Sequence, residues 1–361
     1  MEEELKQEQE KTTNIAKCPE CGANMEYSPK DQALKCPYCG TKVAVDFSKH
    51  SQEIEFKELL EKHEEWDLNA VHVYRCNNCG AVEVLNKKDI SLICPFCGTT
   101  NVIETNEISG IKPNGVVPFL IDAATATTNV INWAKKKFFA PRAFKKSVTP
   151  ESIKGVYSPA FTFDADTDSK YEGRLGRHET ETVTRNGKST TVTKTVYFHV
   201  SGEQILNFDD ILIPASLMIT YRTLEKLSSF DTNNSQEYSD EFLYGFQAEG
   251  KVRSGEECHN EAKQVMKDKI RAAILKRYDY DVVDYLNIAT NFSEETFKYL
   301  LLPIYIGHYA YRNKNYNFYV NGHSGAVTGK TPISVLKVTI LSLIILAIIA
   351  VIVILVLSGG E

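Results

Sequence analysis

Eight of the nine cysteines in this 361-residue chain fall into two copies of one pattern, in which two Cys-x-x-Cys pairs are separated by fourteen residues. Two cysteines three positions apart can place both thiolates on one metal ion, and two such pairs complete a tetrahedral site. A glycine follows every pair and allows the tight turn that brings backbone N–H groups toward the sulfurs. The pattern predicts two zinc sites, formed by Cys18, Cys21, Cys36 and Cys39 and by Cys76, Cys79, Cys94 and Cys97.

The chemistry expected of both sites is structural. Four thiolates leave no open coordination position for a substrate or a water molecule. Disulfides and redox-active Cys-x-x-Cys pairs are the competing interpretations, but the repeated spacing with its four glycines favours metal binding, and no secretory signal precedes the cysteines. A segment this short buries too little apolar surface to fold alone, so zinc is expected to supply most of its folding free energy.

Short hairpins are expected between the cysteine pairs, from Met25–Tyr27 with Ala33–Lys35 and from Val82–Leu85 with Ile90–Ile93. Nearby histidines, His63 and His72, are interpreted as surface or packing residues because both ligand sets are already complete. The amino-terminal part is therefore divided into a disordered lead (1–15), a first zinc ribbon (16–42), a helical linker with a helix over Ile54–Trp66 (43–72) and a second zinc ribbon (73–104).

The other decisive segment is Val338–Leu357, twenty residues without a charged side chain. A helix of this length is about 30 Å long, which matches the hydrocarbon core of a bilayer. It is apolar on every face, which disfavours a buried core helix, so we predict one transmembrane helix and a tail-anchored membrane protein. Lys330 and Lys337 precede it and no basic residue follows, which places the amino-terminal part in the cytoplasm by the positive-inside bias.

The region between these parts, residues 105–334, is expected to be an α+β cytoplasmic domain. Apolar residues recur at helical spacing in three segments, and alternation with turn residues marks several strands. The expected helices are Val130–Phe139, Leu217–Leu227 and Glu257–Lys276, and the expected strands are Tyr157–Phe163, a Thr-rich exposed hairpin over Lys170–Val200 that turns at Asn186-Gly187, and Leu302–Val320.

Three segments imitate catalytic or ligand-binding motifs without meeting their spacing. Gly325–Thr331 has three residues between its glycines where a phosphate-binding P-loop needs four. The alternating acids Asp164, Asp166 and Asp168 lack the glycine and the glutamate of a calcium loop. Cys258-His259 has no companion that would mark a nucleophile and its base, and is expected at the surface. The sequence therefore predicts a protein that is not an enzyme.

Charge bears on whether the ribbons bind nucleic acid. Residues 1–104 carry 12 basic and 19 acidic side chains, before the thiolates add further negative charge. Phosphate binding needs a basic face, so nucleic acid is disfavoured as a partner. The small cluster Lys135–Lys137 is expected either against anionic lipid headgroups or on a solvated face.

The whole arrangement resembles a family of bacterial membrane proteins with amino-terminal zinc ribbons and a carboxy-terminal transmembrane helix, often labelled TFIIB-type zinc ribbon or primosomal factor-like. The resemblance implies a protein encoded in phage-shock-type operons that helps to hold flotillin-like or PspA-like partners at the membrane. One departure is Cys76-Asn77-Asn78-Cys79, which lacks the usual proline. The residues that carry the resemblance are the Cys-Pro-x-Cys-Gly knuckles at Cys18, Cys36 and Cys94, the segments Val156–Phe161 and Phe318–Gly322, and Gly325, Gly329 and Pro332.

These observations predict a membrane-tethered zinc-ribbon scaffold that recruits or anchors protein partners at the cytoplasmic face, in envelope stress or membrane organisation. Closed metal sites, a single anchor and the lack of catalytic residues motivate this hypothesis. The alternative is a membrane-anchored nucleic-acid-binding zinc-ribbon protein linked to replication or transcription.

Overall fold

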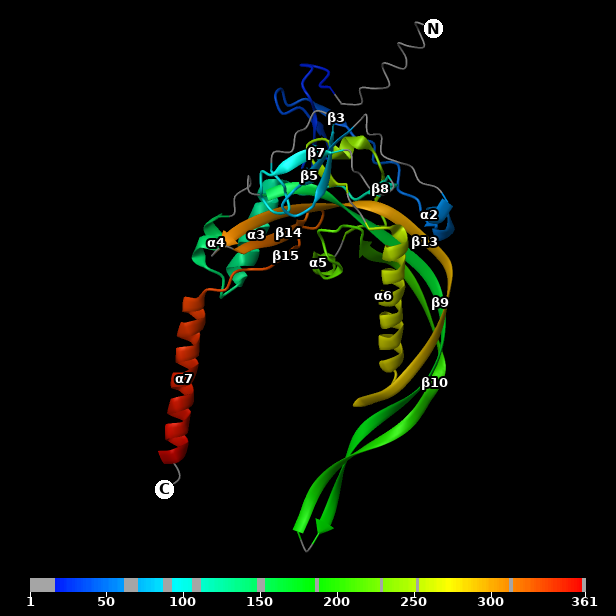
Figure 1. Ribbon diagram of the computed structural model, residues 1–361, viewed down its shortest axis with the longest axis vertical. Coiled ribbons are helices and arrows are strands. Elements are labelled where there is room, and N and C mark those ends of the chain that lie inside the picture. The colour runs from blue at the N-terminus through cyan, green and yellow to red at the C-terminus, as the bar shows by residue number, and fades with distance from the viewer. Residues whose placement is uncertain are drawn as a thin grey trace.

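Three very long antiparallel strands form the backbone of the molecule in the computed structural model (Figure 1). β9 (Ile153–Arg185) lies in the centre, with β10 (Lys188–Pro214) on one side and β13 (Val282–Tyr311) on the other. The residues that the structure describes are 17–61, 71–86, 93–105, 112–147, 153–185, 188–227, 230–250, 253–311 and 314–358, so the expected lead at 1–15, His63 and the Asn186-Gly187 turn lie outside them.

The long strands owe their shape to alternation and to bulges. Tyr157, Phe161 and Phe163 point into the core from one face of β9, as a period of two residues requires. The register shifts between Phe208 and Ile211 in β10 and between Ser293 and Thr296 in β13. Such bulges bend a strand and increase its twist, which accounts for the curved ribbon seen in Figure 1.

The expected α+β class of residues 105–334 needs correction, because this region is mainly one large sheet with a few helices attached. The hairpin predicted over Lys170–Val200 is the far end of β9 and β10, and β13 begins at Val282, twenty residues before the predicted strand. Shorter strands extend the same sheet: β8 (Gly115–Val116), β11 (Gln236–Glu237), β12 (Gln247–Glu249), β14 (Lys314–Asn321) and β15 (Val327–Gly329), with β4 (Ile54–Glu55) at the side of β13.

The helices lie close to their predicted positions but differ in length. α3 (Ala123–Lys136) starts before the predicted Val130, since Asp122 caps it by accepting from Thr125 N–H. Only two turns of the predicted Leu217–Leu227 helix are formed. The predicted Ile54–Trp66 helix begins two residues later, because Ile54–Glu55 is a strand, and its part beyond Glu61 lies outside the described residues. The remaining helices are α2 (Phe56–Glu61), α4 (Arg142–Ser147), α5 (Tyr221–Leu227), the 3₁₀ helix η2 (Asp240–Leu243) and α6 (Gly255–Leu275).

α6 packs along the long strands and corrects one expectation. Ser254 and Glu257 form a capping box at its start, and its buried face includes Ala262, Met266, Ile270 and Ile274 at helical spacing. The expected surface pair Cys258-His259 belongs to this buried face. His259 Nε2 lies 2.5 Å from the Glu295 carboxylate, and its ring stacks on Phe56 at 3.6 Å between centroids. The imidazole is thus held in the packing between α6, Phe56 and Phe163.

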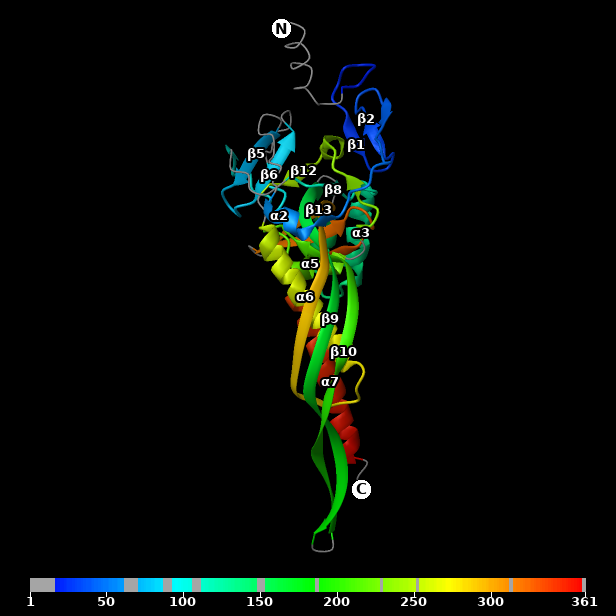
Figure 2. The ribbon, with the colours of Figure 1, turned by 90° about the vertical axis from the view of Figure 1, so that its right-hand side faces the viewer.

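Both cysteine-bearing modules lie at the same end of the molecule (Figure 2). The first has its own three-stranded sheet of β1 (Glu26–Ser28), β2 (Ala33–Lys35) and β3 (Lys42–Ala44). In the second, β5 (Val71–Cys76) pairs with β6 (Val82–Asn86) and with β7 (Val102–Thr105), while β6 pairs with β12. The predicted partner of β6 at Ile90–Ile93 lies largely outside the described residues. The second module is thus part of the large sheet.

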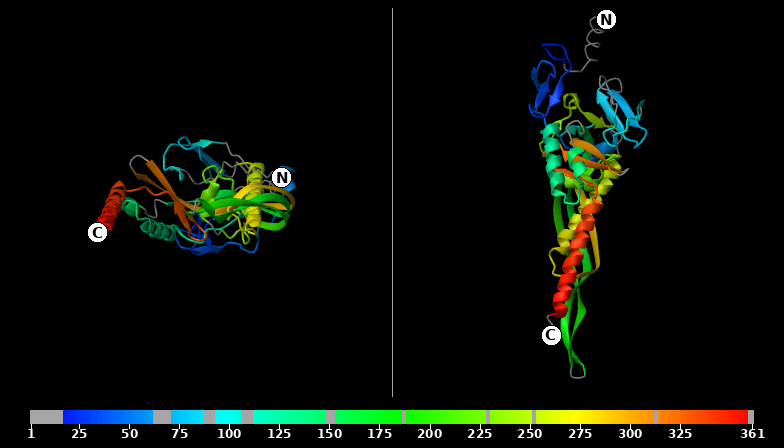
Figure 3. Two further views of the ribbon diagram at one scale, coloured as in Figure 1. Left: turned by 90° about the horizontal axis from the view of Figure 1, so that it is seen from below. Right: turned by 90° about the vertical axis from the view of Figure 1, so that its left-hand side faces the viewer.

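α7 (Val335–Ser358) is a single isolated helix that begins three residues before the predicted span. Its segment Val335–Leu355 has a mean hydropathy of 3.4 and is long and apolar enough to cross a membrane. Its recorded contacts with the body are made at its start, where Ser334 N–H donates to Phe139 O and Lys337 Nζ donates to the carbonyls of Phe138 and Ala140. α7 and the β9–β10 hairpin leave the body in the same direction (Figures 1 and 3).

Candidate metal centres

The four cysteine pairs share one backbone geometry. In each, the glycine N–H donates to the carbonyl of the first cysteine, as in Gly22 to Cys18 O at 2.9 Å and Gly98 to Cys94 O at 2.9 Å. Gly22, Gly40, Gly80 and Gly98 all have φ between 71° and 79°, a conformation that residues with a side chain rarely adopt. The glycine after each pair is therefore required by the turn.

The turns bring the eight predicted ligands together in two groups of four. Sγ atoms of Cys18 and Cys39 are 3.3 Å apart in the first cluster, and those of Cys79 and Cys94 are 3.7 Å apart in the second. Within each cluster the four sulfurs lie within 4.8 Å of one another. A tetrahedral ion with metal–sulfur bonds of about 2.3 Å needs sulfurs about 3.8 Å apart. Each cluster therefore fits one metal ion of its own, held by four thiolates.

The two clusters differ in their exposure to solvent. Cys21 and Cys39 of the first cluster are exposed, whereas Cys79 and Cys97 of the second are only partly so. Burial raises the pKa of the Cys79 thiol to about 12 and raises that of Cys94 as well. The pKa of Cys21 in the first cluster is also raised to about 12, where hydrogen bonds with the Cys36 and Cys39 side chains favour the neutral thiol. Metal binding therefore has to displace thiol protons in both clusters.

One side chain in the third knuckle position distinguishes the clusters more sharply. Tyr38, between Cys36 and Cys39, is 83% exposed, whereas Phe96, between Cys94 and Cys97, is 2% exposed. The Phe96 ring belongs to a core cluster with residues of β13 and α5, and its carbonyl accepts from Asn317 Nδ2 at 3.0 Å. The knuckle Cys36–Cys39, called the first knuckle below, is thus presented to solvent. The knuckle Cys94–Cys97, called the second knuckle, is fixed to the body.

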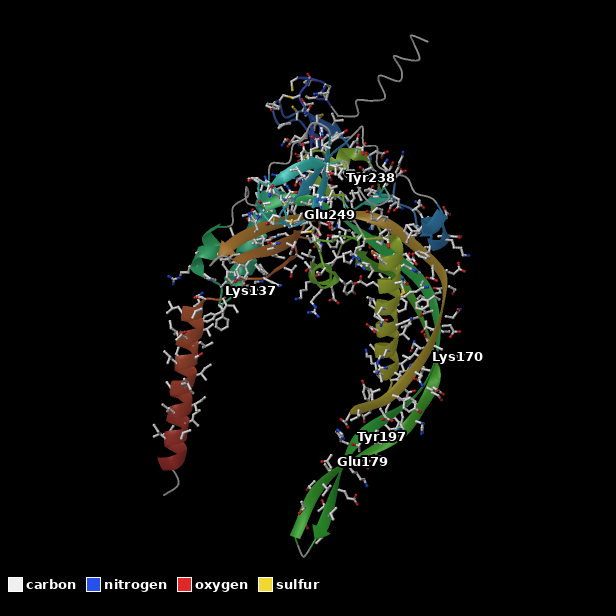
Figure 4. All side chains as sticks on the ribbon, in the orientation of Figure 1. Lys137, Lys170, Glu179, Tyr197, Tyr238 and Glu249 are labelled. Atoms are coloured by element: carbon white, nitrogen blue, oxygen red, sulfur yellow. The ribbon has the colours of Figure 1, made fainter. Side chains whose placement is uncertain are left out.

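Two buried carboxyl groups at the junction of the second module and the sheet escaped the sequence analysis. Glu83 of β6 and Glu249 of β12 are directly opposed and each is nearly inaccessible. Glu249 accepts from Leu217 N–H at 3.1 Å and from the Ser158 hydroxyl at 3.3 Å, and burial raises its pKa to about 7. Figure 4 places it in the middle of the body. The signal in the sequence that could have found Glu83 is an acidic residue between the apolar residues of a short strand, Val82-Glu83-Val84.

A third group of possible ligands is acidic: Glu53, Asp164 and Asp209. Lys298 lies among these acids, with its Nζ 3.0 Å from the carboxylate of Asp210 and 3.7 Å from Glu53. Burial is the main cause that raises the pKa of Asp164 to about 6. The buried lysine therefore supplies a positive charge beside this group, through ion pairs with Glu53 and with the neighbouring Asp210. His72 likewise pairs with Glu104 at 2.6 Å and lies outside both metal clusters.

The difference in exposure predicts the order in which the clusters lose metal. A chelator added to the metal-loaded protein is expected to remove the ion of the first cluster severalfold faster than that of the second, because a competing ligand reaches exposed thiolates directly. Isotope-coded alkylation during chelation, read by mass spectrometry, reports each cysteine separately. Equal labelling rates for Cys39 and Cys97 would contradict the expected order.

Comparison with known proteins gives one informative relative. The chain is 26% identical over 326 residues to YdjG of Bacillus subtilis (strain 168), described as an uncharacterized protein. The match covers 89% of this chain and 91% of the relative. No family model matches, and no solved structure matches either. This protein is thus similar, over nearly its full length, to a bacterial protein that is described without an activity.

Proposed function

We propose that this protein is a membrane-tethered zinc-ribbon scaffold that recruits a protein partner through its first ribbon. The observation that carries the proposal is the exposed Tyr38 of the Cys36–Cys39 knuckle. The first module, which contains β3, lies at the end of the molecule away from α7 (Figure 1). Exposed aromatic side chains are frequent anchors of protein–protein interfaces. A second ribbon fixed to the sheet holds the body rigid behind this surface.

Zinc is the ion proposed for both clusters, because four thiolates in a tetrahedral arrangement favour it and thiolate-rich sites stay reduced in the cytoplasm. α7 is proposed to cross the membrane once, with the ribbons on the cytoplasmic side, since Lys330 and Lys337 precede it. The partner chemistry that we favour is a flotillin-like or PspA-like protein at the membrane, which follows from the family resemblance.

The test is crosslinking and affinity mass spectrometry on the full chain in its native membrane. Tyr38→Ala is expected to reduce partner recovery by about tenfold or more, the size of an interface hot spot, and to leave stability nearly unchanged because the side chain is exposed. Tyr197→Ala, which removes a half-exposed tyrosine of β10, is the matched control.

Two results would oppose the proposal. Recovery of the same proteins by the wild type and the Tyr38→Ala variant would show that the first knuckle is not the contact. Recovery of replication or transcription proteins together with nucleic acid, in a salt-dependent manner, would favour the nucleic-acid alternative.

A further inference from the structure

A cavity of about 520 Å³ opens between the second knuckle, α5 and the strands β14 and β15. Three cationic side chains line it, Arg222 and Lys226 from α5 and Lys330 from the segment after β15, and no acidic side chain does. The volume is within the range of about 300–1,000 Å³ found for small-molecule sites. The charge of the lining selects an anion.

The three cations are not engaged elsewhere in the described part of the chain. No ion pair recorded there involves Arg222, Lys226 or Lys330. Glu225 also belongs to α5, but it is not among the residues that line the cavity. Cations from two separate segments around one concave surface concentrate positive potential there, which raises the local concentration of anions.

The remaining walls indicate what kind of anion fits. Thr220, Thr223 and Thr328 line the same cavity. The Thr220 and Thr223 hydroxyls lie 3.0 Å apart, so one donates to the other, which leaves one of these two and Thr328 to donate to an oxygen-rich group. Cations together with hydroxyl donors recognise phosphate oxygens by charge-assisted hydrogen bonds. The partly buried side chains of Met218 and Tyr319 supply an apolar wall, so the ligand carries an uncharged portion beside its phosphate.

The cations have a possible competing role, because Cys97 of the second cluster also lines the cavity. Four thiolates and one divalent ion carry a formal charge of about −2, which nearby cations can balance. Three cations exceed that charge, so positive potential remains for a ligand. Metal retention by variants of the three cations separates the two roles.

The cavity is close to the start of the apolar helix. Lys330 precedes Val335, the first residue of α7, by five positions. Even a fully extended chain would place these two residues no more than about 17 Å apart. α5 and α7 also lie on the same side of the long strands (Figure 1). A bilayer around α7 would bring lipid phosphates within reach of this cavity.

We infer that the cavity between the second knuckle and α5 binds a phosphate-bearing anion with an apolar portion, either the headgroup of an anionic lipid or a soluble phosphate ester. The site is separate from the exposed knuckle at Tyr38, so this inference does not depend on the proposed protein partner. Arg222, Lys226 and Lys330 contact the phosphate, while Met218 and Tyr319 contact the rest of the ligand.

The experiment uses the metal-loaded full chain in phosphatidylcholine nanodiscs. One arm titrates glycerol 3-phosphate and follows binding by calorimetry. The other replaces part of the lipid with phosphatidylglycerol and counts retained phosphatidylglycerol by native mass spectrometry. Binding in the first arm identifies a soluble phosphate ester as the ligand class, and retention in the second alone identifies a lipid headgroup.

The variant is Arg222→Gln with Lys226→Gln and Lys330→Gln, and its matched control is Lys267→Gln with Lys269→Gln and Lys276→Gln, which removes equal charge at exposed positions of α6 and its carboxy-terminal cap. We expect binding of the positive probe to fall at least about tenfold in the variant, since hydrogen bonds to charged groups are lost, and to persist in the control.

Three results would overturn the inference. The first is the absence of binding by wild-type protein in both arms. The second is an equal loss in variant and control, which would reflect total charge only. The third is loss of the second metal ion from the variant, measured by metal stoichiometry, which would show that the cations serve the thiolate cluster.

Discussion

Cys94→Ser is expected to remove one metal ion per chain and to unfold the second module together with the adjoining sheet. Structural zinc contributes about 10–16 kcal/mol of apparent free energy in zinc-finger peptides, which is comparable to the whole stability of a typical domain, about 5–15 kcal/mol. Cys94 is fully buried, and the β6 strand of its module pairs with β12 of the main sheet. Loss of this metal therefore cannot remain local.

The matched control for this substitution is Cys39→Ser in the exposed first cluster. It is also expected to lose one metal ion, but to lower the main thermal transition less than Cys94→Ser does. The strands β1, β2 and β3 form a sheet of their own and join the body through side chains such as Tyr27 and Leu34. Metal stoichiometry and near-ultraviolet circular dichroism during heating measure both effects. A Cys94→Ser protein that keeps both ions and its unfolding temperature would refute the assignment of the second cluster.

Removal of the chain from Val335 onward is expected to move the protein from the membrane fraction to the soluble fraction. Sixteen of the residues in Val335–Leu355 are Ile, Leu or Val, and each contributes about 0.3–0.6 kcal/mol to insertion, or about 5–10 kcal/mol together. None of this span is buried against the body, so the sheet should keep its unfolding temperature. Fractionation by ultracentrifugation and a thermal scan measure the two expectations.

A milder variant tests the same segment without deletion. Ile345→Arg with Ile349→Arg places two charges near the middle of the span and is expected to cost about 5–7 kcal/mol of insertion free energy. Ile345→Leu with Ile349→Leu is the neutral control. If the truncated chain still sedimented with membranes, another part of the protein would have to bind lipid.

The two groups of four cysteines were predictable because metal coordination requires a fixed spacing of its ligands along the chain. All eight predicted cysteines are brought together in the predicted two groups. Helix α6 was predictable for a similarly local reason, since its capping box and apolar spacing lie within one segment. By contrast, the interaction of His259 with Glu295 joins residues far apart in sequence, and no local pattern at Cys258-His259 announced it.

The sheet was underestimated because its strands carry mixed patterns. The first half of β13 contains Asp284, Asn287 and Asn291, which interrupt simple alternation, and its strand conformation depends on pairing with β9. The exposure of Tyr38 and Phe96 in the candidate site likewise depends on contacts that are distant in sequence. Both occupy the third position of a Cys-Pro-aromatic-Cys knuckle, and only tertiary packing decides which is exposed.

The direction of the β9–β10 hairpin constrains how the protein can sit beside a bilayer. β13 begins opposite Gly176, and beyond this residue β9 and β10 continue as a two-stranded tip. The tip includes Glu179 (Figure 4) and carries exposed charges such as the Lys194–Glu181 pair. Such a tip cannot enter hydrocarbon, although it leaves the body in the same direction as α7. If α7 crosses a bilayer, the polar tip has to stay outside the hydrocarbon, so the hairpin would have to lie along the membrane surface and could not run parallel to α7.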